Sequence, residues 1–128
     1  MKYVYNISEK NKLISISQCD LYSFQEVKGL INVIIKDPQY KPTYNFLIDL
    51  REIKYTPIID EMKELSEYLI SLKKHFGGVS IIISNNDVHH DLFRYAATLV
   101  SKKGLKIRHF YNPEHAKRWI NHINSNIT

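Results

Sequence analysis

The spacing of apolar and polar residues divides the chain into short segments that alternate like strands and longer segments with helical spacing. Apolar and polar residues alternate over Tyr3–Ile7 and again over Leu13–Ser17, with a polar segment between them. Two alternating runs joined in this way are typical of a β-hairpin. Apolar runs within Tyr44–Ile53 and Val79–Ser84 predict two buried strands, and Leu105–Phe110 predicts a last one.

Four longer segments repeat apolar residues at helical spacing, so that each has one apolar side. They cover residues 24–36, 57–75, 88–103 and 113–123. The second has clear signals at both ends: Thr56 is expected to cap it, Pro57 fits its first turn, and Gly77–Gly78 ends it.

The order of these elements, ββαβαβαβα, predicts an α/β fold. Strands joined through helices run parallel, so we expect a five-stranded, mixed but mostly parallel sheet that starts with an antiparallel hairpin. Because most of the strands alternate apolar with polar residues, we expect the four helices mainly on one face of the sheet. No linker or repeat divides the chain, and residues 1–128 are interpreted as a single domain.

Composition fits this picture and excludes several classes of protein. A chain of 128 residues that is 44% hydrophobic can bury one sizeable core. No apolar run is long enough to cross a membrane, and residues 1–6 lack the apolar core of a signal peptide. The single cysteine, Cys19, excludes an internal disulfide and a thiolate metal cluster. These features predict a cytoplasmic protein.

The positive charge is concentrated at the end of the chain. The net charge is +5, and residues 101–128 carry all of this excess. Their basic residues are Lys102, Lys103, Lys106, Arg108, Lys117 and Arg118. A basic patch of this kind favours an anionic ligand, a lipid headgroup or an acidic protein surface; the alternative is an ordinary solvated face. Nucleic acid is not expected, since no recognised binding motif is present.

Clusters of chemically reactive residues are sparse. Asp87–Asp91 holds two histidines and two aspartates, but a capped helix start with solvent-facing histidines explains it better than a metal site does. Asp49 and Glu52 flank Arg51, which favours an ion pair over paired catalytic carboxylates. We therefore expect no catalytic residue, no metal and no cofactor.

Three segments resemble the bacterial SpoIIAA-like proteins of the STAS superfamily. They are Asp37–Tyr40, Asn45–Glu52 and Phe110–Ile120, and the resemblance extends over nearly the whole chain. It implies the SpoIIAA-like fold, which is shared with a family of lipid-binding domains, and a regulatory role like that of an anti-sigma-factor antagonist.

The resemblance also implies where a partner would bind, and here the chain departs from the family. The classical members carry an Asp-Ser pair at the start of the second helix, where a kinase phosphorylates the serine. This chain has Pro57, Ile58 and Ile59 at those positions, and the nearest hydroxyl, on Thr56, is interpreted as a helix cap. We therefore expect a non-catalytic protein-interaction module that binds without phosphorylation, with Tyr55–Ile59 contacting an unidentified protein partner.

Three alternatives stay open. One of the two isoleucines could face the core, so that the segment contacts nothing. The protein could instead bind a lipid or another small apolar or anionic ligand. It could also form a homodimer that buries the half-polar face of the sheet and the strand Tyr3–Ile7, which is expected at an edge of the sheet.

Overall fold

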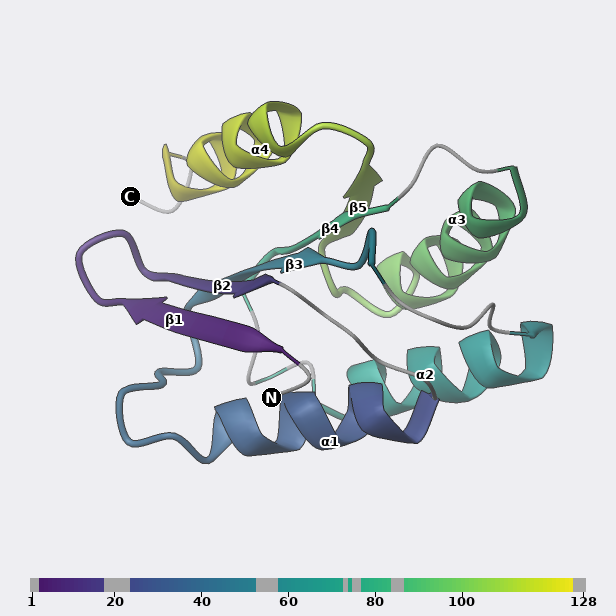
Figure 1. Cartoon of the computed structure of the whole chain (residues 1–128), viewed down its shortest axis with the longest axis horizontal. Coiled ribbons are helices and arrows are strands. Elements are labelled where there is room, and N and C mark those ends of the chain that lie inside the picture. Colours follow the sequence, from purple (N-terminus) through teal and green to yellow (C-terminus); the bar gives the residue numbers. More distant parts are fainter. Residues whose placement is uncertain are drawn as a thin grey trace.

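A five-stranded mixed sheet forms the middle layer of the computed structural model, which describes residues 3–17, 24–52, 58–72, 74, 77–83 and 87–125 (Figure 1). The strands follow their chain order across the sheet: β1 (Val4–Ser8), β2 (Leu13–Ser17), β3 (Asn45–Asp49), β4 (Val79–Ile82) and β5 (Ile107–Phe110). β1 and β2 are antiparallel, and every other neighbouring pair is parallel. The α/β fold with an N-terminal hairpin is therefore confirmed.

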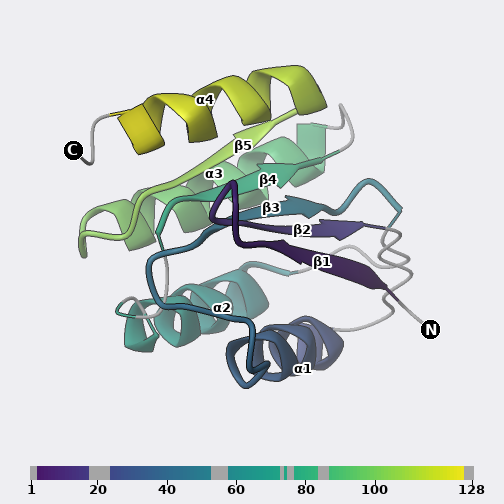
Figure 2. The same cartoon turned by 90° about the vertical axis from the view of Figure 1, so that its left-hand side faces the viewer.

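The helices cover the two faces of the sheet unequally. α1 (Phe24–Ile35), α2 (Ile59–Ser71) and α3 (Asp87–Ser101) lie on one face, and α4 (Pro113–Ser125) lies alone on the other (Figures 1 and 2). This arrangement confirms the expectation of helices mainly on one face. The N-terminal ends of α2, α3 and α4 lie toward the same side of the molecule as the ends of β3, β4 and β5.

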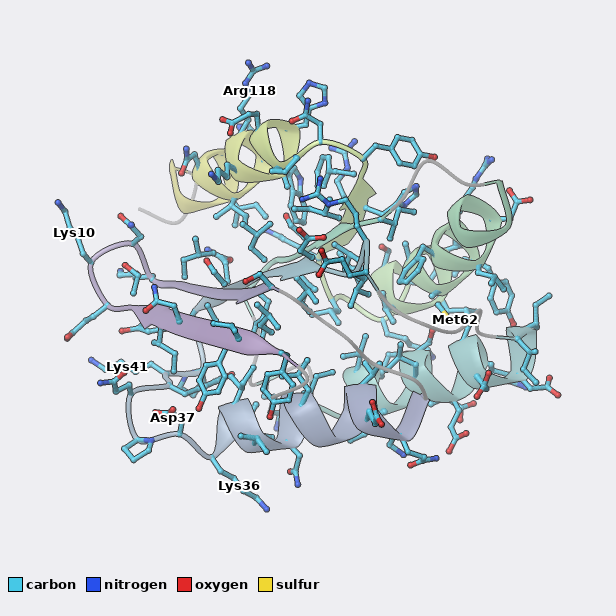
Figure 3. The ribbon with its side chains drawn as sticks, viewed as in Figure 1. Lys10, Lys36, Asp37, Lys41, Met62 and Arg118 are labelled. Atoms are coloured by element: carbon cyan, nitrogen blue, oxygen red, sulfur yellow. The ribbon has the colours of Figure 1, made fainter. Side chains whose placement is uncertain are left out.

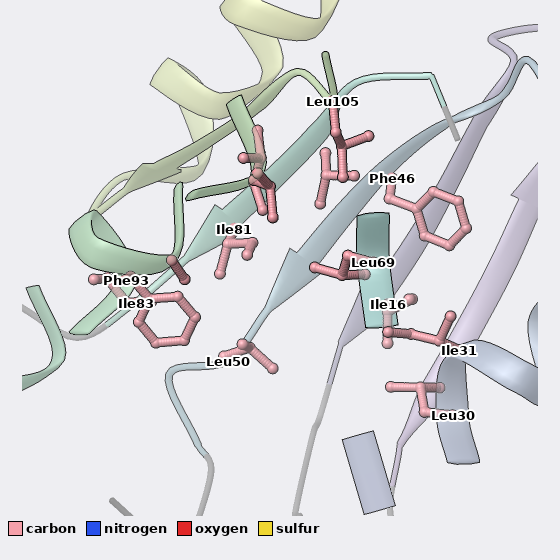
Figure 4. Packing of buried hydrophobic residues seen from close by; sticks show 14 of the residues in the cluster. Ile16, Leu30, Ile31, Phe46, Leu50, Leu69, Ile81, Ile83, Phe93 and Leu105 are labelled. Atoms are coloured by element: carbon pink, nitrogen blue, oxygen red, sulfur yellow. The ribbon is translucent and has the colours of Figure 1, made fainter. Parts of the chain in front are cut away.

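Strand alternation decides which side chains enter the larger core, between the sheet and the first three helices. Ile14 and Ile16 of β2 point into it, while Ser15 and Ser17 point to the opposite face. Phe46 of β3 lies in the same core and is only 1% exposed. Figure 4 shows how these strand residues meet the helices; its labels include Ile16, Phe46, Ile81, Leu30, Leu69 and Phe93.

A smaller core lies under α4. Leu47 and Ile82 pack there against Ala116 and Ile120. α4 packs on β3, β4 and β5 and reaches Leu13 of β2, whereas the same face of β1 has no packing contact with α4. Val4 on that face is 45% exposed. The sheet thus ends in an exposed β1 edge, as predicted.

The second helix begins later than predicted. Its first residue is Ile59 and its N-cap is Ile58, so the expected start at Pro57 with Thr56 as the cap is wrong. The backbone N–H of Ile58 donates to Glu61 Oε1 at 3.0 Å, so a carboxylate from the first turn provides the capping interaction. Thr56 and Pro57 themselves lie outside the described residues.

Tyr40 has a buried hydroxyl whose effect on stability can be tested. Its hydroxyl is buried without a hydrogen-bond partner in the described part of the chain, and burial raises the pKa of Tyr40 from 10.0 to about 12. Between these pH values the unfolded chain releases the proton that the folded chain keeps, so the free energy of unfolding falls as the pH rises.

We therefore expect Tyr40→Phe to stabilise the protein by about 1 kcal/mol at neutral pH, because an unsatisfied hydroxyl is removed. The variant should also lose less stability between pH 10 and 12. Urea denaturation at several pH values measures both effects. A variant less stable than wild type at neutral pH would show that the hydroxyl is satisfied.

Candidate functional site

The start of α2 carries an apolar surface that consists of Ile58 and Ile59, named here the Ile58–Ile59 surface. The two side chains are 60% and 57% exposed. The buried stripe of α2 begins only at Met62, which lies in the core. The alternative in which one isoleucine faces the core is therefore wrong. Tyr55, Thr56 and Pro57, predicted as further contacts, lie outside the described residues.

An ion pair lies at the end of β3, before the connection to α2. Arg51 Nη2 is 2.7 Å from Asp49 Oδ2, and Arg51 Nε donates to Asp49 Oδ1 at 3.0 Å. Burial alone would raise the pKa of Asp49, but the hydrogen bonds and the charge of Arg51 outweigh it and lower the pKa. A carboxylate held ionised in this way is unsuited to proton transfer, and the predicted ion pair is confirmed.

The predicted basic patch divides into separate regions. Lys102, Lys106 and Arg108 lie around β5, whereas Lys117 and Arg118 lie on α4. Lys117 Nζ is 3.8 Å from Glu114 Oε1, and Arg118 points away from the sheet (Figure 3). Lys103 follows α3 and is exposed. The six residues therefore do not form one continuous patch.

A groove follows β5, the outer strand of the sheet, and is named here the β5-edge groove. It consists of two hollows of about 520 and 560 Å³ that share Ser101, Ile107 and Arg108. Residues of α4 complete the first hollow and residues of α3 the second: Trp119, His122 and Ile123 in α4, and Arg94, Ala97 and Thr98 in α3. The groove is thus walled by a helix on each side of the sheet.

Aromatic rings hold Arg108 on the α4 side of the groove. The guanidinium carbon lies 5.6 Å from the ring centroid of Phe110 and 6.0 Å from that of Trp119. Both distances are within the range of a cation–π interaction. These contacts fix a positive charge beside the outer strand.

Arg94 is the residue that the sequence reasoning missed. It lies before residue 101, in the part of the chain whose net charge is zero, so it was not included in the predicted basic patch. A signal was present: Arg94, Ala97, Thr98 and Ser101 are spaced to share one side of a helix. That side of α3 borders the β5-edge groove.

A ligand cavity inside the fold would have supported a lipid binder. The apolar cavity between α2, α3 and β5, which is lined by residues such as Met62, Leu69 and Phe93, has a volume of only about 20 Å³. This space is about that of one water molecule and far below that of a ligand pocket.

Metal and membrane hypotheses gain no support. In the part of the chain that the structure describes, no three His, Cys, Asp or Glu residues are placed to hold a metal ion. The side chains of residues 87–90 and all of Cys19 lie outside that part. No described helix combines the length and apolar character needed to cross a membrane.

The resemblance to SpoIIAA-like proteins rests on the sequence motifs and the order of the elements. No protein-family model, curated protein or solved structure matches the chain.

Proposed function

We propose that this protein is a non-catalytic protein-interaction module and that the Ile58–Ile59 surface docks its partner. The observation that carries the proposal is the exposure of two adjacent isoleucines at the start of a helix. Burying a large aliphatic side chain in an interface contributes roughly 2 kcal/mol. Two such side chains make a compact anchor of the kind that protein interfaces use.

We further propose that the chain is a cytoplasmic, bacterial SpoIIAA-like protein whose binding is independent of phosphorylation. The element order and the α/β sheet support this assignment. Neither Ile58 nor Ile59 can accept a phosphoryl group, so this surface cannot be switched by a kinase in the way of the classical family members.

Binding of a lipid or other apolar ligand is the weaker alternative, because the apolar cavity between α2, α3 and β5 is too small for one. The anionic-ligand alternative concerns the β5-edge groove, which lies apart from the Ile58–Ile59 surface.

The double variant Ile58→Asp/Ile59→Asp is expected to lose the partner and keep its fold. Aspartate at an N-cap and at the first helical position favours a helix, so α2 should gain about 0.5–1 kcal/mol. The measurement is the set of proteins captured from a lysate of the source cells by wild-type and variant baits, with thermal melts of both.

The matched control is Asn32→Asp/Val33→Asp on α1, which makes the same change in charge at an exposed apolar position. Val33 is 48% exposed. The control should capture the same proteins as wild type. Equal capture by the Ile58→Asp/Ile59→Asp bait would remove this surface as the docking site.

Self-association through the β1 edge is a separate prediction. β1 ends the sheet, and α4 does not cover its neighbouring face. Pairing of two β1 strands would give a symmetric dimer. Light scattering at high micromolar concentration should give twice the chain mass of 15.1 kDa; a constant monomer mass at these concentrations would refute the dimer.

A further inference from the structure

The backbone of β5 has one side toward β4 and the other toward the β5-edge groove. Val79 N–H donates to the carbonyl of Lys106 at 2.8 Å, and Ile83 N–H donates to the carbonyl of Phe110 at 2.9 Å. In a parallel ladder alternate residues turn their N–H and C=O groups to the same neighbour. The backbone N–H and C=O groups of Lys106, Arg108 and Phe110 therefore point toward β4. Those of Ile107 point the other way, toward the groove.

Positive charge lies on both walls of the groove. Arg94 and Lys102 line the α3 side, and Lys106 and Arg108 line the α4 side. None of the described residues that line the two hollows is acidic. In the described ranges, no ion pair involves Arg94, Lys102 or Lys106, so their charges are available to a ligand.

We propose that the β5-edge groove binds an acidic segment of a partner protein, which adds to the sheet as an extended strand beside β5. This interaction is separate from docking at the Ile58–Ile59 surface and stands if that docking fails. An added strand forms main-chain hydrogen bonds with an edge strand, and its side chains alternate between the two faces of the sheet. Here each face presents two cations, so acidic side chains find partners on both sides.

The residues that line the groove favour a peptide over a polynucleotide. Single-stranded nucleic acids stack their bases on exposed aromatic side chains. Trp119 is half-buried, and its ring is engaged by Phe110 at 6.0 Å between centroids and by Arg108. Apolar groups of Ala97 and Ile123 line the walls beside the cations, as suits a segment that mixes acidic with aliphatic residues.

The test is binding of a fluorescent peptide of about ten residues, in which pairs of glutamates alternate with pairs of valines so that both faces of an added strand carry acidic side chains, followed by anisotropy with the full chain. Reversing the α3-side charges in Arg94→Glu/Lys102→Glu should weaken binding about tenfold, since two ion pairs are lost and two repulsions are added. The control Lys10→Glu/Lys36→Glu makes the same charge change at exposed sites near β1, at the far edge of the sheet (Figure 3), and should stay within about twofold of wild type.

Two further measurements separate strand addition from simple charge attraction. Two peptides are made, one with N-methyl groups on the odd-numbered residues and one with N-methyl groups on the even-numbered residues. At least one of them should lose binding, because N-methylation removes the N–H groups that would pair with β5. Hydrogen exchange at the Ile107 amide should slow when the unmodified peptide binds.

Several results would overturn the proposal. They are the absence of saturable peptide binding, equal losses in the two charge-reversal variants, and full binding by both methylated peptides. Tighter binding of a single-stranded oligonucleotide, or of vesicles rich in anionic lipid, would assign the groove to another polyanion.

Discussion

Replacing Gly77 by alanine is expected to destabilise the protein by about 3 kcal/mol. A Cβ atom at this position would lie 2.6 Å from Asn45 Oδ1, 2.7 Å from the carbonyl oxygen of Thr43 and 3.1 Å from that of Tyr44. Two of these atoms belong to the backbone that leads into β3. The clash therefore cannot be relieved by rotating a side chain.

The same contacts hold the chain before β4 against the start of β3. Gly77 N–H donates to the carbonyl of Tyr44 at 2.9 Å, and Gly78 N–H donates to Asn45 Oδ1 at 2.6 Å. Asn45 is fully buried, so each displaced hydrogen bond would leave a polar group without water. The pairing of β3 with β4 should weaken as a result.

Urea denaturation followed by circular dichroism measures the effect of Gly77→Ala. Gly29→Ala is the control, because nothing lies within 4 Å of a Cβ atom there and alanine favours the helix; a gain of about 0.5–1 kcal/mol is expected. If Gly77→Ala unfolds at the same urea concentration as wild type, the close approach of the two segments is not present in solution.

Phe46→Ala should also destabilise the protein strongly, by about 4 kcal/mol. The ring is almost completely buried in the larger core, and β3 places Phe46 between Ile14 of β2 and Val79 of β4. Alanine would leave a cavity in the middle of the sheet that surrounding side chains can fill only partly.

The control for Phe46→Ala is Tyr111→Ala, an aromatic truncation after β5, where the side chain is exposed. It should change the free energy of unfolding by no more than about 0.5 kcal/mol. Equal stability losses in both variants, measured by urea denaturation, would contradict the placement of Phe46 in the core.

The sheet and its faces were predictable because strand alternation has a fixed period. Tyr5 and Ile7 pack on the larger core, and Ile14 and Ile16 do the same one strand away, as their spacing indicates. The start of α2 was not predictable, because Thr56–Pro57 is a common helix signal, whereas the capping interaction at Ile58 comes from Glu61 inside the helix. The Asn45 contact to Gly78 joins segments far apart in the sequence, so no local pattern contains it.

The candidate sites were also predictable only in part. From the sequence, Ile58 and Ile59 could both be exposed, or one of them could belong to the buried stripe of α2. The structure shows that both are exposed and that the buried stripe begins at Met62. The basic residues appeared as one patch along the chain, but Lys117 lies across α4 from the β5-edge groove. Arg94 joins the groove because α3 packs beside β5, which depends on tertiary structure.

Photo-crosslinking from position 58 tests the central claim, that the Ile58–Ile59 surface docks a protein, most directly. A photoreactive phenylalanine analogue is placed at Ile58 or, as a control, at Val33, in the full chain expressed in the source cells. The claim predicts a discrete crosslinked protein from position 58 and none from position 33. No crosslink from position 58, or the same products from both positions, would contradict it.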